Sequence, residues 1–360
     1  MSFYRFLVSV LLTGMLLTAC TAGFTNSSSQ SAALQENPAI TAAAVQETVA
    51  GRLVIYSGRS EALIQPVIEA FELAYPQVEV LLKAGSNSEL ANALLEEQAN
   101  PQADVFITTE LFTVQSLAEK GAFQPYLPQG AEQLPSEFTG DENLWTGLTR
   151  RARVIMYNTE LVKPEELPTS IFDLTDKKWK GWVAAAGSTN GSMQAQIAAM
   201  RQLMGGQATE EWLQGLIDNQ VTFFGGHTDV RKAVGAGEFK LGLVNHYYYH
   251  LQRAEGSPVG VVYPDQGEGQ IGMITNATAA AIVAGSRNLD LAQAFLDYLI
   301  SLEGQELFAR LNYEYPLLAE AATLAELPPL DEFQLAAVDP ALIAQEFEAT
   351  FDLMEQLGLP

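Results

Sequence analysis

The residues whose side chains are best suited to binding or reaction occupy seven consecutive positions, Val244 to His250, which read "VNHYYYH". Three tyrosines follow one another there, and two of the three histidines of the chain flank them. Phenol and imidazole groups titrate and exchange hydrogen bonds, so the run fits a binding site. A buried aromatic cluster that supports packing is the alternative. The residue types alone leave both interpretations open.

Motifs of the common enzyme classes are missing from the sequence. It contains no GxSxG, no HExxH, no P-loop and no GxGxxG between a strand and a helix. No serine stands in a strained elbow that a histidine could serve. Pairs of carboxylates are inevitable among 43 acidic residues, so they do not indicate catalysis. We expect a binding protein and not an enzyme.

The first twenty residues, "MSFYRFLVSVLLTGMLLTAC", combine a charged start, an apolar run and a small-residue end. This order is typical of a secretory signal peptide, and the apolar run is too short for a helix that spans a membrane. The end, "LTAC", resembles a bacterial lipobox, in which cleavage before Cys20 leaves a cysteine that receives lipid. Cys20 is the only cysteine, which excludes an intrachain disulfide. The alternative is an ordinary cleaved signal with a chance cysteine.

Residues 21–50 are small and polar and lack an apolar period, which predicts a flexible tether. The remaining residues, about 310, are enough for two domains of ordinary size. The formal net charge of −24 argues against a nucleic-acid partner, because binding a phosphate backbone calls for basic surface.

Short runs rich in β-branched residues alternate with amphipathic runs after the tether. Helices are expected over residues 61–76 and 86–100. Strands joined by helices over such short distances favour parallel pairing in an open α/β sheet. The strand candidates are residues 53–57, 78–85, 103–109, 147–158, 181–186 and 241–244.

Polar turns follow four of these strand candidates, and ligand sites of α/β sheets gather at such strand ends. The turns read "YSGRSE", "TTEL", "GSTNGSMQ" and "NHYYYH". The first three are small and carry hydroxyl groups or glycine, and the fourth holds the tyrosines. Together they predict a cleft for a small ligand that prefers oxygen atoms as partners.

From Leu53 to Leu318 the sequence resembles the ferric-ion-binding proteins of bacterial ABC importers. The resemblance implies a two-lobe periplasmic-binding-protein-like α/β fold of class II, with a mixed sheet flanked by helices in each lobe. Crossover strands would form the hinge, and a transferrin-like iron site would lie between the lobes. The segments that carry it are "YSGRSEALIQPVIEAFE", "ADVFITTE", "WTGLTRRARVIMYNTELV", "STNGSMQ", "GLVNHYYYH", "ATAAAIVAGSRNLDLAQAFLDYLISLEGQELFA" and "EYPL".

The paired tyrosines that bind iron in this family fall on Tyr247 and Tyr248. A phenolate is a strong anionic oxygen donor for a hard trivalent cation. Neighbouring residues of a strand point to opposite faces and could not share one ion. Both tyrosines must therefore lie beyond the strand end, where side chains about 100° apart on a first helical turn converge.

The chain departs from the family at other ligand positions. Ser60 stands where many members have a histidine, and Glu61 follows where some have a tyrosine. The resemblance offers Glu61 as a third metal ligand, and a carboxylate that serves the helix dipole is the alternative. The family's acidic ligand falls near Thr109, next to Glu110. We expect the cleft to be lined by Ser60, Thr109, Glu110, Asn245 and His246.

A small anion such as carbonate or phosphate is expected to complete the iron site. Asn190, Gly191 and Ser192 match the turn that holds an anion in the family, and Ser192 replaces a tyrosine of some relatives. Arg59 or Arg151 would supply charge to it. Ion pairs at the surface or hinge are the alternative for both arginines. His227 is placed outside the metal shell.

The resemblance also implies an extracytoplasmic protein that delivers iron to an ABC permease and its ATPase. It would be a monomer that touches the membrane only through its lipid anchor. Alternatives are the same transport role for an organic anion or another small solute (phosphonate, polyamine, thiamine or sugar), and a ligand-sensing ectodomain. The expected parts are a signal peptide (1–20), a tether (21–50), lobe 1 (51–150 and 278–325) and lobe 2 (151–277 and 326–360).

Overall fold

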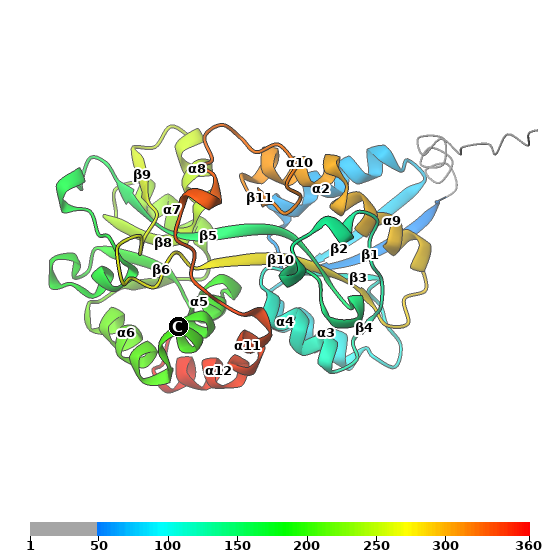
Figure 1. Ribbon diagram of the computed structural model, residues 1–360, viewed down its shortest axis with the longest axis horizontal. Helices are drawn as coiled ribbons and strands as arrows, with labels where there is room; N and C mark the ends of the chain where they lie inside the picture. Colours follow the sequence, from blue (N-terminus) through cyan, green and yellow to red (C-terminus); the bar gives the residue numbers. More distant parts are fainter. Residues whose placement is uncertain (1–48) are drawn as a thin grey trace, which may run out of the picture. The chain divides into compact units, whose positions relative to one another are not determined.

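The computed structural model describes residues 49–360. Cys20, the signal peptide and nearly all of the predicted tether lie outside these residues. Over the described part the strands form one continuous mixed sheet in the order β2-β1-β3-β10-β5-β8-β6-β7 (Figure 1). In addition, β9 and β11 pair with β5, and β4 pairs with β10. The strands are β1 (Gly51–Ser57), β2 (Val78–Ala84), β3 (Val105–Thr108), β4 (Phe123–Gln124), β5 (Thr146–Asn158), β6 (Val183–Ala186), β7 (Thr222–Phe224), β8 (Leu241–Asn245), β9 (Val259–Val262), β10 (Thr275–Val283) and β11 (Tyr315–Pro316).

The long strand β5 belongs to two parts of the sheet. Its first half, up to Ala152, pairs with β10 and β11. Its second half, from Arg153, pairs with β8 and β9. We call the part built on β1–β4, β10 and β11 the first lobe and the part built on β6–β9 the second lobe. One uninterrupted strand thus connects the lobes, as Figure 1 shows.

Helices cover both faces of the sheet because their apolar sides pack on it. Phe71 of α2 and Phe295 of α9 are fully buried in the first core. Met193 of α5 and Trp212 of α6 are buried in the second. The helices are α2 (Glu61–Ala74), α3 (Asn87–Glu96), α4 (Leu111–Glu119), α5 (Gly191–Met204), α6 (Gly206–Asp218), α7 (His227–Gly235), α8 (His246–Ala254), α9 (Leu289–Ile300), α10 (Leu302–Asn312), α11 (Pro340–Gln345) and α12 (Phe347–Gln356).

The parallel pairing expected from the sequence is present where β1 pairs with β2 and β3. Helix α2 ends at Ala74, two residues before the predicted stop. It also runs through Pro66, which costs the helix one backbone hydrogen bond. Boundaries shifted by so little leave each turn at the end of its predicted strand.

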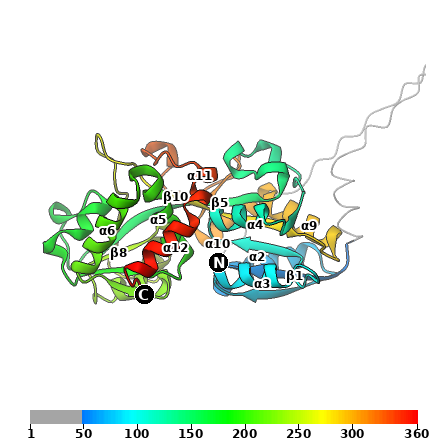
Figure 2. The same ribbon diagram turned by 90° about the horizontal axis from the view of Figure 1, so that it is seen from below.

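The segment after β11 returns past both lobes. Helix α12 packs on α5 of the second lobe, whereas α11 packs on both α4 and α5 (Figure 2). Among residues 49–360, no helix is long and apolar enough to cross a bilayer.

Candidate functional site

A cavity of about 440 Å³ lies where strands from both lobes end. Most of its wall comes from the turns and first helical residues that follow β1, β2 and β3 in the first lobe and β6, β7 and β8 in the second, and Arg151 of β5 adds to it. The turns singled out in the sequence therefore meet at one place. Of the residues named there, the cavity is lined by Arg59, Ser60, Thr109, Arg151, Asn190, Gly191, Ser192, Tyr247 and Tyr248.

Tyr247 and Tyr248 lie in the first turn of α8, immediately after β8 ends at Asn245. Their ring centroids are 4.2 Å apart and their planes are inclined by 33°. The helical turn brings two adjacent side chains to the same cavity, which a strand would not do. Burial raises the pKa of Tyr248 well above its usual value of 10, and the neighbouring Tyr247 raises it further. Without a cation, Tyr248 is a neutral phenol at physiological pH.

His227 also lines the cavity, at the start of α7. Its ring lies edge-on to that of Tyr248, with centroids 5.2 Å apart. Its Nε2 lies 2.9 Å from Nη1 of Arg153. Because a guanidinium can only donate, Nε2 must be an acceptor and the ring proton must be on Nδ1. Burial and the nearby Arg153 hold the pKa of His227 well below its usual value, so the ring is neutral.

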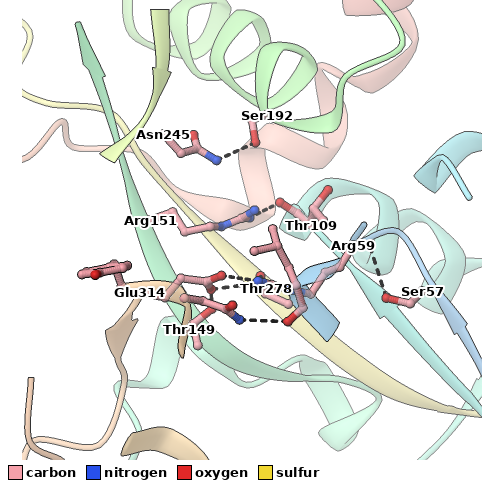
Figure 3. Close-up of polar contacts among 12 residues, drawn as sticks. Ser57, Arg59, Thr109, Thr149, Arg151, Ser192, Asn245, Thr278 and Glu314 are labelled. Atoms are coloured by element: carbon pink, nitrogen blue, oxygen red, sulfur yellow. Dashed lines mark hydrogen bonds and ion pairs between the residues drawn. The ribbon is translucent and has the colours of Figure 1, made fainter. Parts of the chain in front are cut away.

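Arg59 reaches the cavity from the turn after β1 and is neutralised by Glu314 (Figure 3). Both side chains are fully buried. Nη1 of Arg59 lies 3.1 Å from Oε2 of Glu314 and donates to the hydroxyl of Thr278 at 3.0 Å. Burial opposes the charge on each partner, but their mutual attraction outweighs it, raising the pKa of Arg59 and lowering that of Glu314.

Arg151 differs from Arg59 in having no ion pair with any residue in the range 49–360. It extends from β5 and is only 1% exposed. Its Nη2 donates to the backbone oxygen of Thr109, which also accepts from Asn276 at 3.2 Å. Its Nε atom is buried without a partner among the described residues. A buried cation without an ion-pair partner favours an anion beside it.

The turn before α5 offers hydrogen-bond donors to the same space. Oδ1 of Asn190 caps the helix by accepting from the backbone amides of Ser192 and Met193 at 3.1 and 3.2 Å. The amides of Thr189 and Gly191 form no hydrogen bond with any described residue. Both residues line the cavity. A helix N-terminus with free amides is an anion-binding arrangement.

Four predicted site residues do not line the cavity. Glu61 is exposed in the first turn of α2. Glu110, Asn245 and His246 are buried behind the wall. The expectation that these three line the cleft is therefore corrected: each is occupied by contacts within the protein.

These contacts explain why the three buried residues cannot face a ligand. The carboxylate of Glu110 accepts from Asn87 and from the Thr113 amide at 2.8 and 2.9 Å, and burial raises its pKa to about 7. Nδ1 of His246 accepts from the Ala152 amide at 3.2 Å, and its Nε2 donates to the backbone oxygen of Tyr313 at 2.7 Å.

The side chain of Asn245 links Arg153 of β5 to Ser192 of α5. Its Oδ1 accepts from Nη1 of Arg153 at 3.1 Å. Its Nδ2 donates to Oγ of Ser192 at 3.0 Å, as Figure 3 shows. It therefore ties the end of β8 to the first turn of α5. Arg153 and Glu314 are partners in this site that no sequence motif indicated. Arg153 lies two residues from Arg151 on β5, so strand periodicity places both on one face.

Residues 100–339 match the profile of a family described as bacterial extracellular solute-binding proteins. The chain belongs to this family. Iron uptake protein A1 of Synechocystis sp. is 34% identical to this chain, and the match covers 71% of this chain and 73% of the relative. The Fe(3+)-binding periplasmic protein of Serratia marcescens is 29% identical, over 85% and 90%.

Solved structures agree with these relatives. Iron-bound HitA from Pseudomonas aeruginosa superimposes with a TM-score of 0.79 at 28% identity, covering 86% of this chain and 99% of HitA. A Trichodesmium protein in complex with iron and citrate gives 0.70 at 30% identity, covering 86% and 100%. The resemblance and the two-lobe fold expected from the sequence are thereby confirmed. The family consists of extracytoplasmic binding proteins, so that location and the absence of an enzymatic role are confirmed as well.

Proposed function

We propose that this solute-binding protein captures ferric iron in the cavity and delivers it to an ABC permease and its ATPase. The observation that carries the proposal is the pair Tyr247 and Tyr248, whose adjacent phenols reach one cavity from a single helical turn. Ferric iron is a hard cation that displaces protons from phenols and binds the resulting oxygen anions. The relatives named for iron support this assignment.

A small anion such as carbonate or phosphate completes the coordination in this proposal. Two phenolates supply two negative charges and two donor atoms, fewer than an octahedral shell requires. Arg151 and the free amides of Thr189 and Gly191 are the groups positioned to hold the anion. Arg59 is less suited, because Glu314 already neutralises it.

Capture includes closure of the lobes on the ligand. Residues of both lobes line the cavity, so a ligand that touches both stabilises the closed arrangement over an open one. Small-angle scattering should therefore show a smaller radius of gyration after ferric ion is added. An unchanged radius would mean that the lobes do not close on iron.

The test of iron binding is a ferric titration followed by visible absorption. Charge transfer from tyrosinate to iron gives the wild-type protein a visible band. Tyr247→Phe and Tyr248→Phe should each abolish or nearly abolish it, because each removes one anionic donor. Tyr249→Phe is the matched control, since Tyr249 is the next residue of α8 and does not line the cavity. Unchanged affinity in the Tyr247→Phe, Tyr248→Phe double variant would refute the iron site.

Transport of a small organic anion is the second candidate. It is favoured by Arg151, which lines the cavity, has no ion pair with any described residue and keeps its Nε atom without a hydrogen-bond partner there. Such a ligand would not need phenolates, so the double phenylalanine variant would keep its affinity for the anion. Iron binding that disappears in the same variant would decide for the ferric ion.

Anchoring through lipid on Cys20 is part of the proposed function. The lipobox-like "LTAC" at the end of an apolar run supports it. Cys20→Ala should shift the protein from the membrane fraction to the soluble fraction, and mass spectrometry of the wild type should find lipid on Cys20. A Cys20→Ala protein that stays fully anchored would contradict the assignment.

A further inference from the structure

The segment Phe347–Pro360 contacts the first lobe at one end and the turn of the proposed anion site at the other. We propose that this segment positions the turn 188–192 and favours the separation of the two lobes at which the cavity binds its ligand. The proposal rests on the proposed function for the identity of that ligand. We call residues 347–360 the positioning segment.

Its contact with the turn is a backbone hydrogen bond. The amide of Ser188 donates to the backbone oxygen of Pro360 at 2.6 Å. Only Thr189 and Asn190 separate Ser188 from Gly191, which lines the cavity. A side-chain carbon at Gly187 would lie 2.1 Å from the same oxygen. Glycine at this position is what allows the segment to come so close.

Its contact with the first lobe is aromatic. The ring of Phe347 lies 5.0 Å from that of Phe112 in α4, and Phe351 lies 4.8 Å from Phe347. Phe112 is buried. The two α12 rings also line an apolar groove of about 190 Å³ together with Leu95 of α3 and Leu117 of α4. Figure 2 shows α12 beside α5, with α11 toward α4.

The positioning segment is fixed to the second lobe between these two contacts. Leu353 and Met354 are buried in the second core, and Leu359 is buried with them. A packed helix moves as a rigid unit, because a close-packed interior resists small shifts. A displacement at Phe347 moves α12, and Leu359, buried in the same core beyond the helix end, passes it to the adjacent Pro360 and so to the turn.

This coupling affects affinity in two ways. Contact between Phe347 and Phe112 favours the arrangement in which both lobes reach the ligand, so losing it lowers the fraction of binding-ready molecules and raises the apparent Kd. The hydrogen bond to Ser188 fixes the direction of the amides that follow it. Losing that bond affects the part of the affinity that depends on the anion.

The experiment compares Phe347→Ala and Gly187→Ala in the full chain. Ferric affinity is measured in carbonate-free buffer and with carbonate added back. The lobe separation of the ligand-free protein is measured with spin labels at Glu96→Cys on α3 and Gln214→Cys on α6, in a Cys20→Ser background. Phe172→Ala is the matched control, because Phe172 is half-buried and packs against the second core only.

We expect Phe347→Ala to weaken ferric binding about tenfold in both buffers and to lengthen or broaden the label distance. We expect Gly187→Ala to weaken binding about tenfold only with carbonate present and to keep the wild-type distance. Phe172→Ala should lower stability and change neither readout. Circular dichroism checks that each variant is folded.

The proposal is overturned if Phe347→Ala and Gly187→Ala both bind within about twofold of wild type with wild-type label distances. A wild type that binds no iron would refute the proposed function instead. In that case the label distance of Phe347→Ala still tests whether the positioning segment holds the lobes together.

Discussion

Arg59 and Glu314 form an ion pair in which both side chains are fully buried, with Nη1 of Arg59 3.1 Å from Oε2 of Glu314. The pair joins the turn after β1 to the residue before β11. Glu314 also accepts from the hydroxyl of Thr149 on β5. The carboxylate of Glu314 therefore links Arg59 at the cavity and Thr149 of β5 to the start of β11.

Removing this carboxylate should destabilise the protein strongly. Glu314→Gln leaves Arg59 buried without a counter-charge, and we expect the free energy of unfolding to fall by about 3 kcal/mol. Denaturant unfolding measures it. Glu137→Gln is the control, because its ion pair with Arg150 is partly exposed and should contribute less than about 1 kcal/mol. Similar losses in the two variants would contradict the importance of the buried pair.

The same pair predicts the direction of acid sensitivity. Arg59 holds the pKa of Glu314 below its usual value of 4.5. A lowered folded-state pKa means that the stabilisation is present above the ordinary value and is lost as pH falls through the folded one. The difference in unfolding free energy between wild type and Glu314→Gln should therefore shrink below pH 4.5. A free-energy difference that does not change with pH would mean that protonation of Glu314 does not remove its stabilising effect.

Ferric affinity should fall as pH falls. Tyr248 is a neutral phenol in the free protein because burial raises its pKa, so binding must release its proton. Each released proton makes the apparent Kd change about tenfold per pH unit. Competition titrations between pH 6 and 8 with a chelator of known proton dependence measure the slope. A slope of zero would mean that no phenol deprotonates on binding.

Arg151 should control the dependence on the anion. Arg151→Gln removes the unpaired cation of the cavity, and we expect the gain in ferric affinity on adding carbonate or phosphate to drop about tenfold. Arg150→Gln is a close control, because Arg150 is the adjacent residue of β5, pairs with Glu137 and does not line the cavity. Equal anion dependence in wild type and Arg151→Gln would remove Arg151 from the anion site.

Glu61 stays a prediction as the third metal ligand. It adjoins Ser60, which lines the cavity, but its own side chain is exposed in this structure. If it binds iron, Glu61→Gln should weaken ferric affinity several-fold and keep most of the visible band, since the phenolates give the colour. Glu69→Gln, also exposed on α2, is the control. Identical affinities of both variants and wild type would leave Glu61 as a residue that serves only the helix dipole.

The sequence predicted the turns of the site well because their position depends on local patterns. The predicted strands ended within a few residues of the observed ends of β1, β3, β6 and β8, and those ends meet at the cavity. The role proposed for Tyr247 and Tyr248 came from the resemblance to a family. Spacing alone did not separate a ligand pair from an aromatic cluster, and both residues are in fact buried.

Long-range partners were beyond the sequence for a physical reason. Glu314 is one of 43 acidic residues, and nothing in its neighbourhood marks it as the partner of a residue 255 positions away. The wrong expectation for Glu110 has the same origin. A carboxylate at a strand end either faces a ligand or caps the next helix, and the choice depends on Asn87 and Thr113. The segment 340–360 likewise lacks any motif for its contact with Ser188.

The place of β10 in the sheet sets the order in which the chain can fold. β10 lies between β3 and β5, so the first lobe stays incomplete until residues 275–283 are available. The strands of the second lobe, from the end of β5 to β9, follow one another within residues 153–262. Contacts between distant residues form slowly because a long loop must close first. Amides of β8 should thus gain protection before those of β10 in pulsed hydrogen exchange during refolding, because β10 pairs with the more distant strands β3 and β5; the reverse order would disprove it. For a chain that crosses a membrane unfolded, the late arrival of β10 keeps the first lobe open until most of the chain has emerged.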